Sequence, residues 1–179
     1  MIGTAAAAGP DAVSGPPLQG VTGQAAVRVM FTPGDDAAGE IILAIAGARH
    51  QVLVQAYSFT HDGIARALVE AHARGVEVKV IADRQQTEKM ERGQVPGLAA
   101  AGLPVWLDGA HQGAHNKVMV IDAGTRQSVI ITGSYNFTRA AQHKNAENVV
   151  LISGNDVLAQ AYARNWHLHL EHARPLTLH

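Results

Sequence analysis

From residue 26 onward, short apolar runs typical of strands alternate with stretches whose apolar residues recur at helical spacing. The first run, Val27 to Phe31, predicts a strand. A helix is predicted next, because four apolar residues follow at spacings of three, four and three: Ala38, Ile41, Ile45 and Ala48. The carboxylates of Asp35 and Asp36 come just before this helix and favour its N-terminus.

The same order continues with a second strand, a second helix and a third strand. Residues His50 to Ser58 alternate as a strand does, and Val76 to Ala82 follow as another strand. Between them, Thr60 is predicted to cap a helix that ends at Gly75 and buries Ile64, Leu68 and Ala71. A strand, helix, strand order of this kind predicts a right-handed parallel crossover.

The second half of the chain predicts four more strands and two more helices. The strands are expected at Val105 to Leu107, Asn116 to Ile121, Ser128 to Thr132 and Ala146 to Ile152. The helices are expected near Val95 to Ala101 and at about Asn155 to His172, the latter with Leu158, Ala161 and Leu168 toward the core. The polar stretch Asp83 to Gly93 is interpreted as a loop or exposed helical turn, either facing a substrate or simply solvated. The whole pattern predicts an α/β sandwich with a mostly buried sheet.

Composition narrows the class of protein. Hydrophobic residues make up 47% of the 179 residues and no run of about 18 apolar residues occurs, so we expect one globular domain, residues 26–179, without integral membrane association. Residues 1–25 are rich in Ala, Gly and Pro and predict a flexible leader. A processed secretory leader would place the protein in the periplasm or outside the cell, and a cytoplasmic location stays open. Cysteine is absent, which excludes thiolate nucleophiles and cysteine zinc sites.

The charge balance gives only local support for binding of nucleic acid. Lysine and arginine total 14 against 15 acids, so the surface as a whole is not basic. Between residues 111 and 150, however, four cations face two acids. A positive field is therefore expected only in this part of the chain.

This part of the chain also carries the motif H-x-K-x-x-x-x-D, formed by His115, Lys117 and Asp122. Side chains in a strand alternate between faces, so His115 and Lys117 must point the same way and can share one phosphate. Asp122 falls on the opposite face by parity. It is therefore expected to support or orient the site rather than to touch phosphate.

Three polar residues further along complete the candidate site. Ser134 and Asn136 follow Gly133 and are expected to hold phosphate oxygens, while Lys117 stabilises the additional negative charge of the transition state. Glu147 begins the next strand and is expected to accept a proton from the ring nitrogen of His115 that does not attack. With that partner, His115 can attack phosphorus and form a phosphohistidine.

The proposed chemistry requires a second acid and base, and the chain has one H-x-K-x-x-x-x-D motif. A twofold dimer that brings two copies of His115 together would supply it, so we expect a homodimer with one composite site. Three histidines near the end, His167, His169 and His172, are interpreted as an exposed helical face rather than a metal site. Neither a metal nor a cofactor is expected.

The segments HNKVMVID, GSYNFTRAA and KNAENVVLI, together with the upstream VQAYSFTHDGIARALVEAHARGVEVKVIAD, resemble the single-motif bacterial endonucleases of the phospholipase D superfamily, the Nuc-type nucleases. The resemblance implies an α-β-α sandwich with a mostly parallel mixed sheet. It further implies metal-independent hydrolysis of DNA at a dimer interface, with RNA left open as a second substrate. It also implies that His115 is nucleophile in one subunit and general acid in the other. The link between Asp122 and Gly133 is longer than the family pattern.

Two other functions stay open at this point. A lipid phosphodiesterase would use the same site chemistry, although no amphipathic basic helix or exposed aromatic cluster is visible for a membrane surface. A nucleic-acid-binding module without turnover is the other alternative, and the complete set of polar residues in the motif argues against it.

Overall fold

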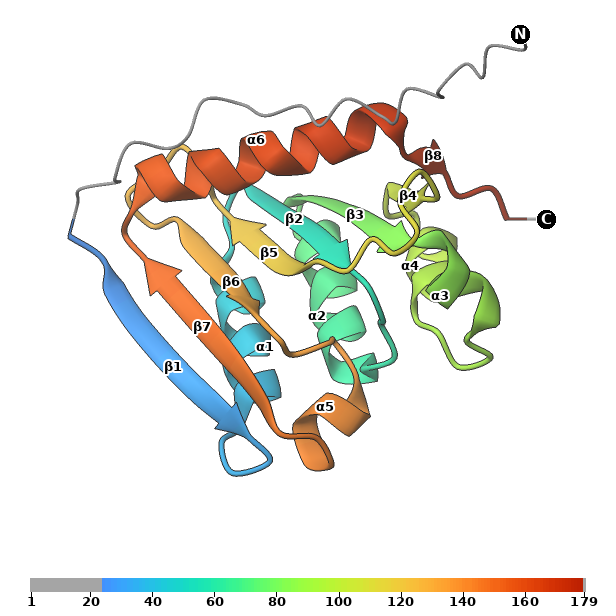
Figure 1. Ribbon diagram of the computed structural model, residues 1–179. Coiled ribbons are helices and arrows are strands. Elements are labelled where there is room, and N and C mark those ends of the chain that lie inside the picture. Colours follow the sequence, from blue (N-terminus) through green and yellow to red (C-terminus); the bar gives the residue numbers. More distant parts are fainter. Residues whose placement is uncertain (1–23, 179) are drawn as a thin grey trace, which may run out of the picture.

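The computed structural model describes residues 24–178, so the predicted leader, residues 1–25, lies almost wholly outside the described part of the chain. Eight strands form one sheet (Figure 1). In chain order they are β1 (Ala26–Thr32), β2 (Gln51–Ala56), β3 (Glu77–Asp83), β4 (Val105–Asp108), β5 (Lys117–Ile121), β6 (Val129–Gly133), β7 (Glu147–Ser153) and β8 (Arg174–Pro175). Their order across the sheet is β1-β7-β6-β5-β2-β3-β4-β8.

Helices cover both faces of this sheet, as expected for an α/β sandwich. They are α1 (Ala37–Gly47), α2 (Asp62–Ala73), α3 (Arg84–Lys89), α4 (Val95–Ala100), α5 (Arg139–His143) and α6 (Asp156–His172). Figure 1 shows α1 and α2 on one face and the long α6 across the other. Within residues 24–178, no helix is both long and apolar enough to cross a membrane.

The sheet is mixed, but the expectation that it is mostly parallel is wrong. Only the β2–β3 and β3–β4 pairs are parallel, and the other five pairs are antiparallel. The reason lies in the connections. Strands β5, β6 and β7 are neighbours in both sequence and space, and β5 is joined to β6 by a link that holds no helix. Such a link returns the chain antiparallel, whereas parallel neighbours need a longer crossover such as α2.

Alternation along β5 divides the core into two layers. Met119 and Ile121 pack with the residues of α1 and α2, whereas Val118 and Val120 pack beneath α6. This is the division that strand parity predicts. Because Lys117 shares the parity of Met119, its side chain leaves the strand on the α1 and α2 side.

The predicted start of α2 is wrong by one residue. His61, not Thr60, caps this helix, and its Nδ1 accepts a hydrogen bond of 3.3 Å from the amide of Ile64. Asp36 caps α1 as expected, by accepting from the amide of Gly39. The polar stretch after β3 is the short helix α3, which the carboxylate of Asp83 caps. Of the loop and the exposed helical turn that the sequence left open for this stretch, the helical turn is therefore correct.

The predicted core face of α6 is wrong toward the end of the helix, although Leu158 packs against the core as predicted. Leu168 is 44% exposed, while Ala159 and Trp166 are fully buried. The indole N–H of Trp166 donates to the carbonyl oxygen of Val54 on β2 at 2.9 Å. Because burying the largest side chain and satisfying its donor outweighs the placement of a single leucine, Trp166 sets the rotation of α6.

Candidate active site

His115 and Lys117 lie together at the start of β5. Nζ of Lys117 is 2.9 Å from Nδ1 of His115 and donates to the carbonyl oxygen of the same histidine at 2.6 Å. The two side chains therefore point the same way, as strand parity predicts. The lysine is 6% exposed, while the histidine is exposed to solvent. A buried cation thus stands directly behind a histidine that a substrate can reach.

Tyr57, just beyond the end of β2, is a neighbour of this pair that the sequence analysis missed. Its ring lies 4.3 Å from the imidazole of His115, centroid to centroid, and Nζ of Lys117 lies 4.8 Å from the same ring. The amide of Tyr57 donates to the carbonyl oxygen of Asn116, which extends the pairing of β2 and β5 by one step. Its hydroxyl accepts from Gln86 of α3 at 3.0 Å. Tyr57 therefore orients the imidazole by packing against it.

The protonation of Lys117 is set by two opposing influences. Burial lowers the pKa of the ammonium below its usual range, because a charge in a poorly solvated position is disfavoured. The nearby carboxylate of Glu147 acts in the opposite direction and raises this pKa. Glu147 thus helps to keep the buried lysine charged.

The contacts of Glu147 differ from those expected. One carboxylate oxygen accepts from the hydroxyl of Ser134 at 2.6 Å, and the other accepts from the side-chain amide of Asn145 at 3.0 Å. Within the described residues, no hydrogen bond joins Glu147 to His115, whose Nδ1 is instead in contact with Lys117. The expected hydrogen bond between Glu147 and His115 is therefore not formed in this structure, where Lys117 occupies Nδ1.

Ser134 is held by the start of β7 on its other side. Its hydroxyl oxygen accepts from the backbone amide of Asn148 at 3.1 Å, and the carbonyl oxygen of Asn148 accepts from the amide of Ser134 at 3.1 Å. This close approach requires Gly133, which has φ of +144°. A Cβ at that position would lie 2.2 Å from the carbonyl oxygen of Asn148. The glycine therefore permits contact with the backbone of β7.

The side chain of Asn136 carries a buried Oδ1 that has no hydrogen-bond partner within residues 24–178. Buried polar atoms are nearly always paired, so this oxygen is an exception that a ligand or a solvent molecule would satisfy. The aromatic residues on either side, Tyr135 and Phe137, are buried in the core. Neither aromatic ring is therefore available to stack on a base of a nucleic acid.

Asp122 lies at the other end of β5 from Lys117. Its carboxylate accepts hydrogen bonds of 2.8 to 2.9 Å from three consecutive backbone amides, those of Arg49, His50 and Gln51. Its backbone has a φ of +50°, which aspartate tolerates better than most residues. The structure therefore does not bring Asp122 to the His115 pair, and its supporting role is to anchor the turn that leads from α1 into β2.

Comparison with known proteins places this geometry in a family. Residues 41–168 match the sequence model of a family described as cardiolipin synthase, PLD-like domain. The chain belongs to the phospholipase D superfamily. It is accordingly a phosphodiesterase in the broad sense of that superfamily.

Two relatives within the superfamily carry different names. The chain is 39% identical over 140 residues to a protein named phospholipase D from Rickettsia bellii, a match that covers 78% of this chain and 67% of the relative. It is 31% identical over 143 residues to a mitochondrial cardiolipin hydrolase from Xenopus laevis, covering 80% of this chain and 65% of the relative. The chain thus spans about two thirds of the length of each.

Solved structures of the superfamily share the fold. One is a phospholipase D family member, Nuc from Salmonella typhimurium, with a TM-score of 0.78 and 32% identity, covering 87% of this chain and all of that one. A second is NucT from Helicobacter pylori, with a TM-score of 0.77 and 22% identity, covering 86% of this chain and all of that one. These similarities confirm the predicted α/β architecture.

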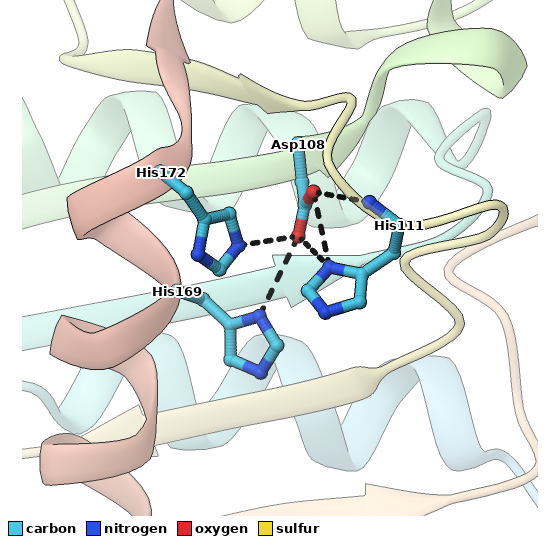
Figure 2. A group of neighbouring side chains, drawn as sticks. All are labelled: Asp108, His111, His169 and His172. Carbon is cyan, nitrogen blue, oxygen red and sulfur yellow. Dashed lines mark hydrogen bonds and ion pairs between the residues drawn. The ribbon is translucent and has the colours of Figure 1, made fainter. Parts of the chain in front are cut away.

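The histidines of α6 correct another expectation. Only His167 is exposed, while His169 and His172 turn toward Asp108 at the end of β4, where His111 joins them (Figure 2). The interpretation of His169 and His172 as part of an exposed face is therefore wrong. The sequence indicated part of this arrangement, because His169 and His172 are three residues apart and so share a helix face. It did not indicate that both would contact the carboxylate of Asp108.

Proposed function

We propose that this superfamily member is an endonuclease that hydrolyses DNA, and also RNA, through a phosphohistidine at His115. The observation that carries the proposal is the pairing of an exposed imidazole with a buried ammonium 2.9 Å away. A phosphate that approaches His115 meets the charge of Lys117 in a poorly solvated position, where a fixed charge stabilises a phosphoryl transition state best. Each step of the reaction uses groups of the protein and no metal.

In the first step, Nε2 of His115 attacks phosphorus, the P–N bond forms, and the P–O bond to the leaving nucleotide breaks. The leaving oxygen takes a proton from a general acid. In the second step, water attacks the phosphohistidine, gives a proton to the same group, and the P–N bond breaks. Ser134 and Asn136 are proposed to hold the phosphate oxygens beside Lys117, and Asp122 is proposed to act only by supporting the strand.

The tautomer of His115 must change before this attack. When the ammonium of Lys117 donates to Nδ1, the ring proton of a neutral imidazole belongs on Nε2, which is then unable to attack. A bound phosphate draws the ammonium away from Nδ1, so that Nδ1 can carry the proton and Nε2 becomes free. Glu147, whose charge already acts on Lys117, is proposed as the acceptor for that proton in the complex.

The general acid is proposed to be His115 of a second copy in a homodimer. One observation supports a position for the contact surface. Strand β1 carries three exposed apolar residues, Val27, Val29 and Phe31, the last of them 62% exposed. Phe31 pairs with Asn148, whose side chain contacts Ser134, so the Phe31 end of this apolar strip lies next to the candidate site. A second copy that covers the strip would bring the two sites together.

A lipid substrate is the second candidate, because the relatives named phospholipase D and mitochondrial cardiolipin hydrolase carry lipid names. One assay separates the candidates. Purified protein is incubated in EDTA with plasmid DNA, single-stranded DNA, RNA, and vesicles of phosphatidylcholine or cardiolipin, with His115→Ala as the control. We expect cleavage of nucleic acid that the variant lacks. Cleavage of lipid alone would establish the second candidate, and binding of DNA without turnover would establish a binding module.

A further inference from the structure

A cluster of three imidazoles and one carboxylate lies outside the candidate active site. Asp108 ends β4, His111 follows it in the next loop, and His169 and His172 come from the last turn of α6 (Figure 2). Each residue offers one ligand atom, and these four atoms all lie within 4.8 Å of one another. Two segments that are distant in sequence, the end of β4 with its following loop and the end of α6, therefore converge on one point.

The three distances from the carboxylate to the imidazoles match the edges of a tetrahedral metal site. Oδ2 of Asp108 lies 3.0 Å from Nδ1 of His111, 3.5 Å from Nδ1 of His169 and 3.2 Å from Nε2 of His172. Bonds of 2.0–2.1 Å in a tetrahedron place neighbouring ligand atoms about 3.3 Å apart. We propose that Asp108, His111, His169 and His172 bind one divalent transition metal ion, with Zn²⁺ the best fit.

Hydrogen bonding alone accounts poorly for this convergence. Oδ1 of Asp108 already accepts from the backbone amides of Ala110 and His111, at 3.0 and 3.4 Å. The same carboxylate faces three imidazole nitrogens: that of His111, 3.2 Å from Oδ1 and 3.0 Å from Oδ2, and those of His169 and His172, 3.5 and 3.2 Å from Oδ2. A cation between them uses all four groups as ligands. The backbone amides then orient the carboxylate, as hydrogen bonds to the other atoms of metal ligands commonly do.

The donor set selects the kind of ion. Three imidazole nitrogens and one carboxylate oxygen favour zinc and related transition metals, whereas Mg²⁺ and Ca²⁺ prefer oxygen ligands in larger number. The carboxylate of Asp108 is 1% exposed, while the imidazoles remain partly open to solvent and leave a path for the ion. Because the protein supplies all four ligands, no position stays open for substrate or water. The site is therefore structural rather than catalytic.

A metal here would brace the loop that leads to the active site. It would fix the end of α6 to β4 and hold His111, which lies four residues before His115. The same loop is tied at Ala114, whose amide donates to Asp83 at 2.8 Å. The residues between β4 and β5 are thus held at both ends, and the exposed histidine of the site follows directly from them.

Metal binding is measured on the full chain after treatment with a chelator and removal of the chelator. Zn²⁺ is titrated in competition with a chromophoric chelator, and thermal unfolding is followed with Zn²⁺ or Mg²⁺ added. We expect one equivalent of Zn²⁺ per chain, a higher Tm with Zn²⁺ than with Mg²⁺, and the visible absorption of tetrahedral Co²⁺ when Co²⁺ replaces Zn²⁺. The same results are expected in His115→Ala, which separates this proposal from the catalytic one.

Two variants and one control locate the site. Asp108→Asn and the double variant His169→Gln/His172→Gln are each expected to weaken Zn²⁺ binding by at least about 100-fold. His167→Gln, an exposed histidine on the same helix, is expected to bind as the natural chain does. Circular dichroism confirms folding, and the double variant gives the decisive result if Asp108→Asn does not fold. Absence of stoichiometric binding, or undiminished binding in the double variant, would overturn the proposal.

Discussion

Nζ of Lys117 lies 2.9 Å from Nδ1 of His115, and this lysine is almost entirely buried behind an exposed histidine. We propose that the two residues act as one unit, in which the position and charge of the ammonium decide which ring nitrogen of the histidine is free. Any change in the ionisation of Lys117 is expected to appear directly in the rate of the reaction.

Replacing Glu147 tests whether the charge of Lys117 controls the reaction, because the replacement changes how activity depends on pH. Burial lowers the pKa of Lys117 and the carboxylate of Glu147 raises it, so removing that charge in Glu147→Gln lowers the pKa further. Activity needs the charged ammonium and is lost as pH rises through this pKa. The alkaline limb of the profile of kcat/KM against pH is therefore expected at lower pH in the variant than in the natural chain. The control is Glu171→Gln, which changes an exposed carboxylate at the C-terminal end of α6. An alkaline limb at the same pH in Glu147→Gln and in the natural chain would contradict the coupling of the Lys117 charge to the reaction.

Asp122→Ala is expected to reduce stability rather than chemistry. The variant leaves three backbone amides without their acceptor and places alanine at a φ of +50°, a combined cost of roughly 3 kcal/mol. Asp122→Asn retains one side-chain oxygen and tolerates this φ, so its loss should be smaller. Urea unfolding measures the free energy, and kcat is measured on the folded fraction. A stable Asp122→Ala protein with no turnover would assign this carboxylate to the chemistry instead.

Gly133→Ala is expected to destabilise the turn that carries Ser134. The added methyl group would meet the carbonyl oxygen of Asn148 at 2.2 Å, and the φ of +144° is unfavourable for alanine, so we expect a loss of about 2 kcal/mol or more. Gly97→Ala is the matched control. This glycine lies exposed in α4 with no neighbour near its added Cβ, and the change should raise stability by about 0.5 kcal/mol. Equal Tm shifts in the two variants would contradict the steric argument.

Subunit mixing tests the composite site. Natural chains are refolded together with His115→Ala chains. If activity requires His115 from both copies, the remaining activity follows the square of the fraction of natural chains, because mixed dimers hold only one histidine. Independent monomers would lose activity in simple proportion. The rate on nucleic acid is measured at constant total protein, and the His167→Gln chain, expected to be active, serves as the control mixing partner. A linear dependence would show that each chain works alone.

Local periodicity predicted the parts of the fold and of the site that depend on residues close together in the sequence. Strand parity placed His115 with Lys117 and separated Val118 from Met119, since alternation is a property of the strand itself. It also moved Asp122 away from phosphate. The direction of neighbouring strands was not predictable in this way, because it depends on whether a connection turns back or crosses over.

Contacts between distant segments were beyond the sequence. Tyr57 reaches His115 only because β2 lies beside β5, and Asp108 meets His172 only because Trp166 sets the rotation of α6. A weakly amphipathic helix offers several faces of similar hydrophobicity, so a single buried indole decided which one was used. The contact of Glu147 with Ser134 likewise depends on side-chain rotamers that no spacing rule describes.

The anchoring of three backbone amides by Asp122 has a consequence for comparing relatives. The histidine and the aspartate of the motif would be selected for different reasons, one for turnover and the other for folding. A descendant that had given up catalysis would then be free to change His115 while still keeping Asp122. In such a lineage, an aspartate that persists beside a substituted histidine would mark a protein that has kept its architecture and retired its chemistry.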